Sequence, residues 1–249
     1  MRNYIVIRFS LKFDYPSFKK INDYLDGLER STWFAWRAEL MKKTLVPAIL
    51  NQRSPVHKVF LFMDKNDKDL YEKFLNLGGV FEPVFCKGSE LNQTLARLLS
   101  AEGSGPMVVS RIDSDDSISV EYTYLINKDF EFSNKISYLV AAKGYISDLL
   151  EIQDIYYNCS PFISIYFPEY EPKTLFFKHL EVLDKKPIVN ITAEWMQILH
   201  GTNVSNKFRT KNIFEVNDKR KMLLGQVRKC IDFWPKGFVQ IDSLPNFSQ

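Results

Sequence analysis

The first half of the chain alternates between short apolar runs and longer amphipathic segments. The apolar runs are typical of strands buried on both faces, and we expect strands at 4–9, 58–63, 80–85 and 107–109. Between them, apolar residues recur every three or four positions, which predicts helices at 36–51, 67–77 and 90–100. This alternation predicts an α/β fold with a mostly parallel central sheet flanked by helices.

The second half has a less regular pattern. We expect a helix at 118–128, strands within 136–142, 145–157 and 162–167, and a helix at 192–200. Thr192 is a suitable N-cap for that helix. The spacing of Leu223, Val227, Ile231 and Trp234 predicts a last, basic amphipathic helix within 215–249. No repeat or linker divides the chain, so we expect a single domain over 1–249 with a less regular C-terminal half.

Composition narrows the class of protein. Hydrophobic residues make up 45% and charged residues 25% of the 249 residues, as in globular proteins. Lys and Arg number 33 against 30 Asp and Glu, and this near balance argues against a nucleic-acid partner. The three scattered cysteines form neither a zinc pattern nor a disulfide framework. The first apolar run is interrupted by Arg8 and is too short for a secretion signal, so we expect a cytoplasmic protein.

An acidic cluster follows the fourth expected strand. The string SRIDSDDSIS at 110–119 places Asp113, Asp115 and Asp116 close together. Such a cluster needs a nearby cation, which Arg111 or a hard divalent ion such as Mg²⁺ or Mn²⁺ would supply. An EF-hand loop is excluded, because its glycine position is Ile118 here. A solvated acidic loop is the alternative, but ligands of open α/β sheets bind at the carboxyl ends of strands.

Several strings, taken in chain order, resemble a known family. They are RFSL at 8–11, WRAEL at 36–40, TLVPAILNQ at 44–52, VFLFMD at 59–64, SRIDSDDSI at 110–118 and WMQILHGTNVSN at 195–206. The arrangement resembles the GT-A fold of nucleotide-sugar-dependent glycosyltransferases, whose DxD motif follows the fourth strand. More specifically, it resembles a rhamnosyltransferase family of bacterial polysaccharide synthesis. The resemblance implies a nucleotide-sugar-binding half at 1–117 and an acceptor half at 118–214.

The resemblance implies a reaction and a donor site. A hexosyltransferase of the inverting type would move a sugar from a nucleoside diphosphate sugar to a polysaccharide or lipid-linked glycan. The resemblance to the rhamnosyltransferase family implies that this sugar is rhamnose. A Mn²⁺ or Mg²⁺ ion would act as Lewis acid on the leaving diphosphate. The implied metal ligands are Asp115, Asp113 and His200, and the implied donor-binding residues are Arg8, Asp64, Arg111 and Asp113.

Two acidic residues are candidates for the base that an inverting transfer requires. Glu194 stands in the first turn of the helix expected at 192–200, where an acidic residue also stabilises a helix start without any catalytic role. Asp116 is the competing candidate. Trp195 and Asn203 are candidate acceptor or sugar contacts, and core packing is the alternative for Trp195.

Other functions and partners stay open. A nucleotidyltransferase would also use carboxylates and Mg²⁺, but RFSLKFDYP near the first strand lacks a basic glycine-rich loop. A non-catalytic sugar-nucleotide-binding or scaffolding protein is the other alternative. The basic segment at 215–249 is either a solvated face or a peripheral contact with anionic lipids at the inner face of a membrane. Aromatic residues reach 14%, and those crowded at 122–177 are interpreted as core packing with part of an acceptor surface.

Overall fold

The computed structural model describes residues 1–12, 30–130, 134–173, 175–176, 179–185, 187–200, 208, 222–230, 232–241 and 243. Within these residues the chain forms one ten-stranded sheet of order β10-β7-β6-β8-β4-β1-β2-β3, with β5 and β9 pairing off this path. The strands are β1 (Arg2–Arg8), β2 (Lys58–Asp64), β3 (Phe81–Cys86), β4 (Met107–Asp113), β5 (Ser117–Ile118), β6 (Ser137–Ser147), β7 (Glu151–Tyr157), β8 (Ile163–Phe167), β9 (Ile188–Ile198) and β10 (Met222–Lys229).

The first four strands form the parallel part of the sheet. β1 pairs in parallel with β2 on one side and with β4 on the other, and β2 pairs in parallel with β3. Because chain order reverses across β1 and β4, their carboxyl ends lie at a topological switch point. β3 is an edge strand, which accommodates Pro83 because an edge position does not need every backbone donor.

Helices cover both faces of this parallel part. They are α2 (Arg30–Lys43), α3 (Leu45–Leu50), α4 (Lys68–Leu70), α5 (Leu91–Ala101) and α6 (Tyr122–Phe130), with the short helical turns η2 (Tyr71–Leu75), η3 (Gly88–Glu90) and η4 (His179–Asp184). Residues of α2, α3, η2 and α6 pack with Ile5 and Ile7 of β1 in one large core. Residues of α5 pack with Tyr4 and Val6 on the opposite face.

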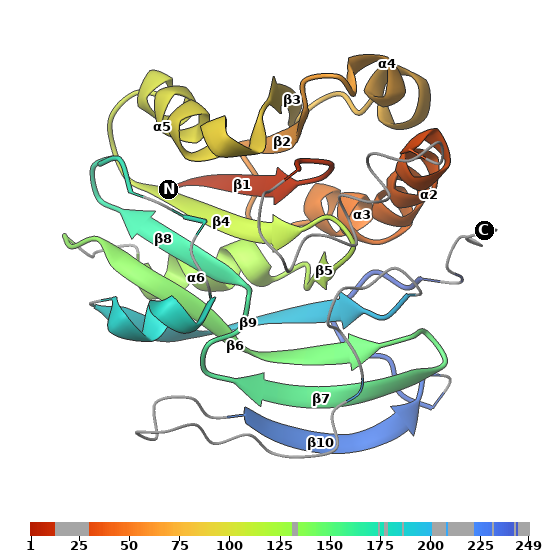
Figure 1. Ribbon diagram of the computed structural model, residues 1–249. Coiled ribbons are helices and arrows are strands. Elements are labelled where there is room, and N and C mark those ends of the chain that lie inside the picture. Colours follow the sequence, from red (N-terminus) through yellow and green to blue (C-terminus); the bar gives the residue numbers. More distant parts are fainter. Residues whose placement is uncertain are drawn as a thin grey trace.

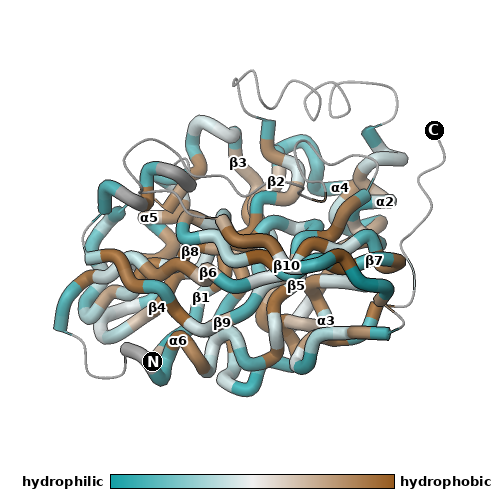
Figure 2. Tube along the Cα trace, turned by 90° about the horizontal axis from the view of Figure 1, so that it is seen from below, coloured by the Kyte–Doolittle hydropathy of each residue, from teal (hydrophilic) through white to brown (hydrophobic). Residues whose placement is uncertain are grey.

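The second half makes the sheet mixed. β4 pairs antiparallel with β8, and β6 pairs antiparallel with β7 and β8. β9 runs parallel to β6 and antiparallel to the short β5. Figure 1 shows the parallel strands beside α2 and α5, and β6, β7 and β10 at the other end of the molecule. Figure 2 shows hydrophobic segments running through the middle of the trace.

The predicted α/β fold with parallel N-terminal strands flanked by helices is confirmed, and the sheet is mixed because the second half adds antiparallel pairs. Two predicted helices are wrong. Residues 192–198 belong to strand β9, so Thr192 is not an N-cap, and residues 222–229 form strand β10. In both segments cross-strand partners satisfy the backbone groups that the expected helix would have satisfied internally. Residues 215–221 of the expected basic helix lie outside the described residues.

Smaller differences concern element ends. The helix expected at 36–51 starts earlier and is broken into α2 and α3 at Thr44. The segment 67–77 forms α4 and the π-helical turn η2, which ends at Asn76 in a left-handed conformation with φ of 35°. β4 continues to Asp113, so the first residue of the acidic cluster belongs to the strand. Among the described residues, no helix is long and apolar enough to cross a membrane.

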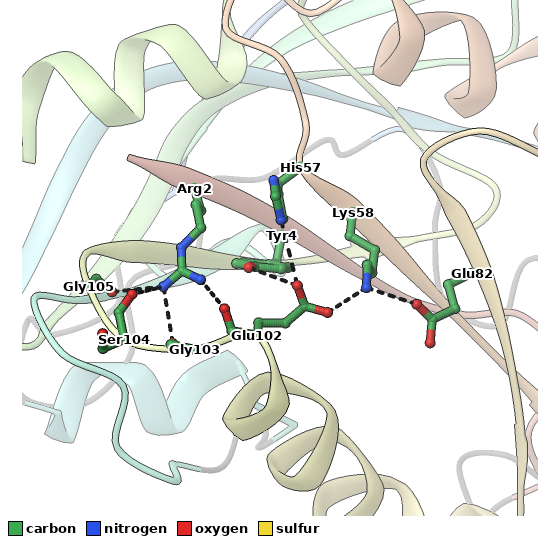
Figure 3. A network of polar contacts seen from close by, with 9 residues as sticks. All are labelled: Arg2, Tyr4, His57, Lys58, Glu82, Glu102, Gly103, Ser104 and Gly105. Carbon is green, nitrogen blue, oxygen red and sulfur yellow. Dashed lines mark hydrogen bonds and ion pairs between the residues drawn. The ribbon is translucent and has the colours of Figure 1, made fainter.

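A polar network holds the amino-terminal edge of the parallel strands together (Figure 3). Arg2 of β1 donates to backbone carbonyls at the end of α5 and the following turn, including Gly103 at 3.2 Å and Ser104 at 2.6 Å. Glu102 accepts from Lys58 at 2.5 Å and from the Tyr4 hydroxyl at 3.3 Å. These contacts tie β1, β2 and α5 together at the edge opposite to the carboxyl ends, and they position the strands that carry the candidate site.

Candidate functional site

An arginine and an aspartate meet across β1 and β4 at their carboxyl ends. The strand register places Arg8 opposite Asp113, and their side chains form an ion pair of 3.2 Å. Arg111 lies two residues before Asp113 on β4, so both side chains point to the same face of the sheet. Arg111 is buried and donates to the Pro161 carbonyl at 3.1 Å. Burial and the nearby Arg8 lower the pKa of Arg111 to about 10.

Asp115 is the centre of a second group, formed by three distant segments. Its Oδ2 atom lies 2.8 Å from Arg37 of α2 and 2.8 Å from Nε2 of His200, which follows β9. Arg37 also donates to the Ser114 hydroxyl at 2.6 Å. Burial alone would raise the pKa of Asp115, but the Arg37 guanidinium and the His200 ring outweigh it and hold that pKa well below its usual range. The carboxylate is therefore ionised in the folded protein.

Asp116 is buried next to this group. It is 1% exposed, and its Oδ1 accepts a hydrogen bond from the Ile198 backbone N–H at 3.3 Å. Burial, together with the charges of Asp115 and Asp113, raises the pKa of Asp116 well above its ordinary value. Asp116 thus anchors the acidic loop to the end of β9 as a buried carboxyl group.

A third polar group extends the site to the carboxyl end of β2. Asp64 ends this strand, and its Oδ1 accepts from the Asn66 backbone N–H at 3.0 Å. Asp67, which is fully buried, accepts from the Ser10 hydroxyl at 2.5 Å and from Nε of Arg30 at 2.8 Å. The Arg30 guanidinium also lies 3.8 Å from Asp64. This group fixes the turn after β2 against the end of β1.

The structure brings only part of the predicted site together. Arg8, Arg111 and Asp113 meet at the ends of β1 and β4, Asp115 meets His200, and Asp64 ends the neighbouring strand β2. Glu194 lies instead on β9, four residues before Ile198. At the usual rise of a strand, these two residues are about 13 Å apart. The Glu194 carboxylate forms an ion pair with Lys143 of β6. Asn203 lies outside the described residues.

Trp195 is a core residue. Its side chain is fully buried, stacks on Phe162 with ring centroids 4.7 Å apart, and donates from Nε1 to the Ala141 carbonyl at 2.5 Å. This corresponds to the core-packing alternative, and the buried indole ring offers no exposed face on which a sugar could stack. The prediction of a sugar contact at Trp195 is corrected accordingly.

Sequence reasoning missed four polar residues of the site. These residues are Ser10, Arg30, Arg37 and Asp67. Arg37 stands within the WRAEL string that carried the family resemblance, so a signal for it was present. Its contact with Asp115 could not be predicted, because α2 is far from the acidic cluster in the chain.

The donor set at Asp115 fits a divalent cation that shares its coordination with a ligand. Among the described residues, no group of three or more His, Cys, Asp or Glu side chains is placed to hold a metal ion. Asp115 and His200 nevertheless supply an oxygen and a nitrogen 2.8 Å apart. Mg²⁺ is usually bound by one or two protein carboxylates together with substrate phosphates, so two protein donors are sufficient for such a shared site.

Comparisons with known proteins give only distant likenesses. No protein-family model and no curated protein matches the chain. S. aureus TarS 1–349 is 13% identical with a TM-score of 0.35, and the match covers 80% of this chain and 60% of that one, less than two thirds of its length. The inositol-1-phosphate CTP transferase of T. maritima is 18% identical with a TM-score of 0.39, covering 80% and 89%. The 4-diphosphocytidyl-2C-methyl-D-erythritol synthase of Anaerococcus prevotii is 14% identical with a TM-score of 0.33, covering 76% and 87%.

These comparisons do not support the resemblance to a rhamnosyltransferase family. None of the matched structures named above is a rhamnosyltransferase, so the sugar stays an expectation from sequence. Likenesses of this strength also carry no information about the chemistry of this chain.

Proposed function

We propose that this chain is a glycosyltransferase that binds a nucleoside diphosphate sugar at the carboxyl ends of β1, β2 and β4. The observation that carries the proposal is the convergence of the Arg8–Asp113 pair and the Arg37–Asp115–His200 group at this switch point. A nucleoside diphosphate sugar carries a phosphate chain that needs cations and ribose hydroxyls that need acceptors. Guanidinium groups and carboxylates at one sheet edge meet both needs.

Each residue has a distinct part in this proposal. Arg8 and Arg37 bind phosphate oxygens, since a guanidinium matches them with two parallel hydrogen bonds. Asp113 accepts from a ribose hydroxyl, and Asp64 at the end of β2 accepts from the nucleobase. Arg111, buried behind Asp113, positions that carboxylate. A Mn²⁺ or Mg²⁺ ion at Asp115 and His200 would polarise the diphosphate and stabilise its developing charge.

The transfer forms a bond between the acceptor oxygen and the anomeric carbon of the sugar and breaks the bond from that carbon to the phosphate oxygen. The acceptor hydroxyl loses its proton to a base. Glu194 is the better candidate, because its side chain is 19% exposed, whereas Asp116 is buried and its pKa is raised by that burial and by the charges of Asp115 and Asp113. The acceptor is proposed to be a polysaccharide or lipid-linked glycan, and rhamnose is the first sugar to test.

Calorimetric titration with a panel of nucleoside diphosphate sugars, with and without Mn²⁺, tests the proposal. We expect binding that Arg8→Gln and Asp115→Asn each weaken by about tenfold or more, because each removes a charge-assisted contact. The matched controls are Arg53→Gln and Asp154→Asn, which alter the ion pairs with Glu121 and Arg228 outside the site. Equal binding by site and control variants would refute the proposal, as would release of pyrophosphate from a nucleoside triphosphate.

A further inference from the structure

Two partners, the Arg37 guanidinium and the His200 ring, share one oxygen of Asp115. Arg37 NH1 and His200 Nε2 both lie 2.8 Å from its Oδ2 atom. The group is largely enclosed, with side-chain exposures of 11% for Arg37, 14% for Asp115 and 2% for His200. A divalent cation cannot take this oxygen while Arg37 holds it, because the two positive charges would repel each other at contact distance.

Arg37 has features that suit a second position. Its buried Nε atom has no hydrogen-bond partner among the described residues. Its guanidinium lies 5.6 Å from the ring centroid of Trp33, one helical turn earlier on α2. A guanidinium moving away from Asp115 would therefore keep a favourable aromatic surface. The unpartnered Nε–H would be available to an oxygen of a ligand.

We propose that Arg37 exchanges partners when the ligand binds. In the free protein it neutralises Asp115, and in the complex it binds the diphosphate while a divalent cation takes its place at Asp115. This inference rests on the proposed function and adds to it an order of events: the cation alone binds weakly, and the nucleotide assists its binding by giving Arg37 an anionic partner. His200 lies beside Asp115 in both states, hydrogen-bonded to it in the free protein and as the second protein ligand of the cation in the complex.

The experiment measures the two ligands separately. Mn²⁺ binding is followed by the electron paramagnetic resonance signal of the free ion, with the metal alone as the probe. Binding of UDP, dTDP, GDP, CDP and ADP at saturating Mn²⁺ is followed by calorimetry. The variants are Arg37→Gln and Arg37→Lys, with Arg53→Gln as the control that alters an arginine outside the site.

The proposal expects effects of opposite sign in Arg37→Gln. Mn²⁺ alone binds about tenfold tighter, because a competing charge is gone. The nucleoside diphosphate binds about tenfold weaker, because a charge-assisted contact is gone. Arg37→Lys keeps the positive charge, so its Mn²⁺ affinity stays near that of the wild type, and its nucleotide affinity falls between the other two. Arg53→Gln matches the wild type in both measurements.

Other outcomes overturn the inference. If Arg37 had only a structural role, Arg37→Gln would weaken the binding of both Mn²⁺ and the nucleoside diphosphate. If Arg37 had no role, both affinities would stay unchanged. If Arg37→Gln does not fold, an Arg37→Lys variant with wild-type affinity for both ligands contradicts the exchange. Failure of the proposed function has a different signature: the wild type binds none of the five nucleotides at any Mn²⁺ concentration, whereas the Mn²⁺ measurement still reports on Arg37.

Discussion

Gly144 leaves room for the buried ring of Trp195. The two residues are direct partners in the parallel pairing of β6 and β9. A Cβ atom built on Gly144 would lie 2.3 Å from two carbons of the indole ring and 2.7 Å from a third. Carbon atoms pack at about 3.5 to 4.0 Å, so the added methyl group would overlap the ring by about 1 Å. Gly144→Ala therefore requires Trp195 or the strand to move.

The surroundings of Trp195 oppose such a movement. The ring is stacked on Phe162 with an interplanar angle of 10°, and its N–H is bonded to the Ala141 carbonyl. Overpacking of a well-packed core costs about 1 to 3 kcal/mol. We expect Gly144→Ala to lower the free energy of unfolding by about 3 kcal/mol, the upper end of this range. The reason is that the overlapping ring is held on one face by Phe162 and at its N–H by Ala141.

Urea unfolding followed by circular dichroism measures this cost. Gly78→Ala is the matched control, since a Cβ there meets no atom within 4 Å, and its free energy of unfolding should stay within about 0.5 kcal/mol of the wild type. Trp195→Ala alone should cost about 3 to 5 kcal/mol. In that background Gly144→Ala should cost much less than in the wild type, because the overlapping ring is gone. An equal cost in both backgrounds would refute the reasoning.

Three further predictions concern acidic residues. Asp116→Asn keeps an acceptor for the Ile198 N–H. Because the pKa of Asp116 is raised in the folded protein, the contribution of this residue to stability falls as pH rises above the ordinary value of 3.8. The variant should therefore be more stable than the wild type at neutral pH and not at acid pH, as measured by urea midpoints over that range. Glu102 behaves oppositely, because Lys58 outweighs the effect of burial and lowers the pKa of Glu102. Glu102→Gln should lower the free energy of unfolding by about 1 to 2 kcal/mol at neutral pH and should have no effect once acid has protonated the wild-type residue. A constant difference in stability across pH would contradict this. Glu194→Gln should lower the rate of sugar transfer about 100-fold or more while donor affinity in calorimetry stays unchanged; a loss confined to donor binding would count against its role as base.

The sequence by itself determined the parallel half and much of the polar edge. The apolar runs that form β1, β2, β3 and β4 are bounded by polar residues and separated by helical patterns, so both strand positions and their common direction were predictable. Because parallel strands share one direction, the residues that end them had to gather at one edge. Arg8, Asp64 and Asp113 lie at this edge for that reason.

Only the tertiary structure decided β9 and β10. The segment at 188–198 contains apolar residues at spacings that suit either a helix or a strand, and pairing with β5 and β6 selects the strand. Local pattern is ambiguous in such short segments, because the energy that discriminates comes from partners elsewhere in the chain. The consequence for function is that Glu194 lies on the sheet beside Lys143 and Trp195 lies in the core.

The same reason explains the polar partners of the site. Arg37 and Ser114 are separated by 77 positions in the chain, and nothing local to either residue indicates the other. Hydrophobic periodicity reports which face of an element is buried, and it carries no information about which charge meets which across elements. Composition and pattern therefore indicated where polar residues would gather, and the tertiary contact of α2 with the residues after β4 decided that Asp115 would meet Arg37.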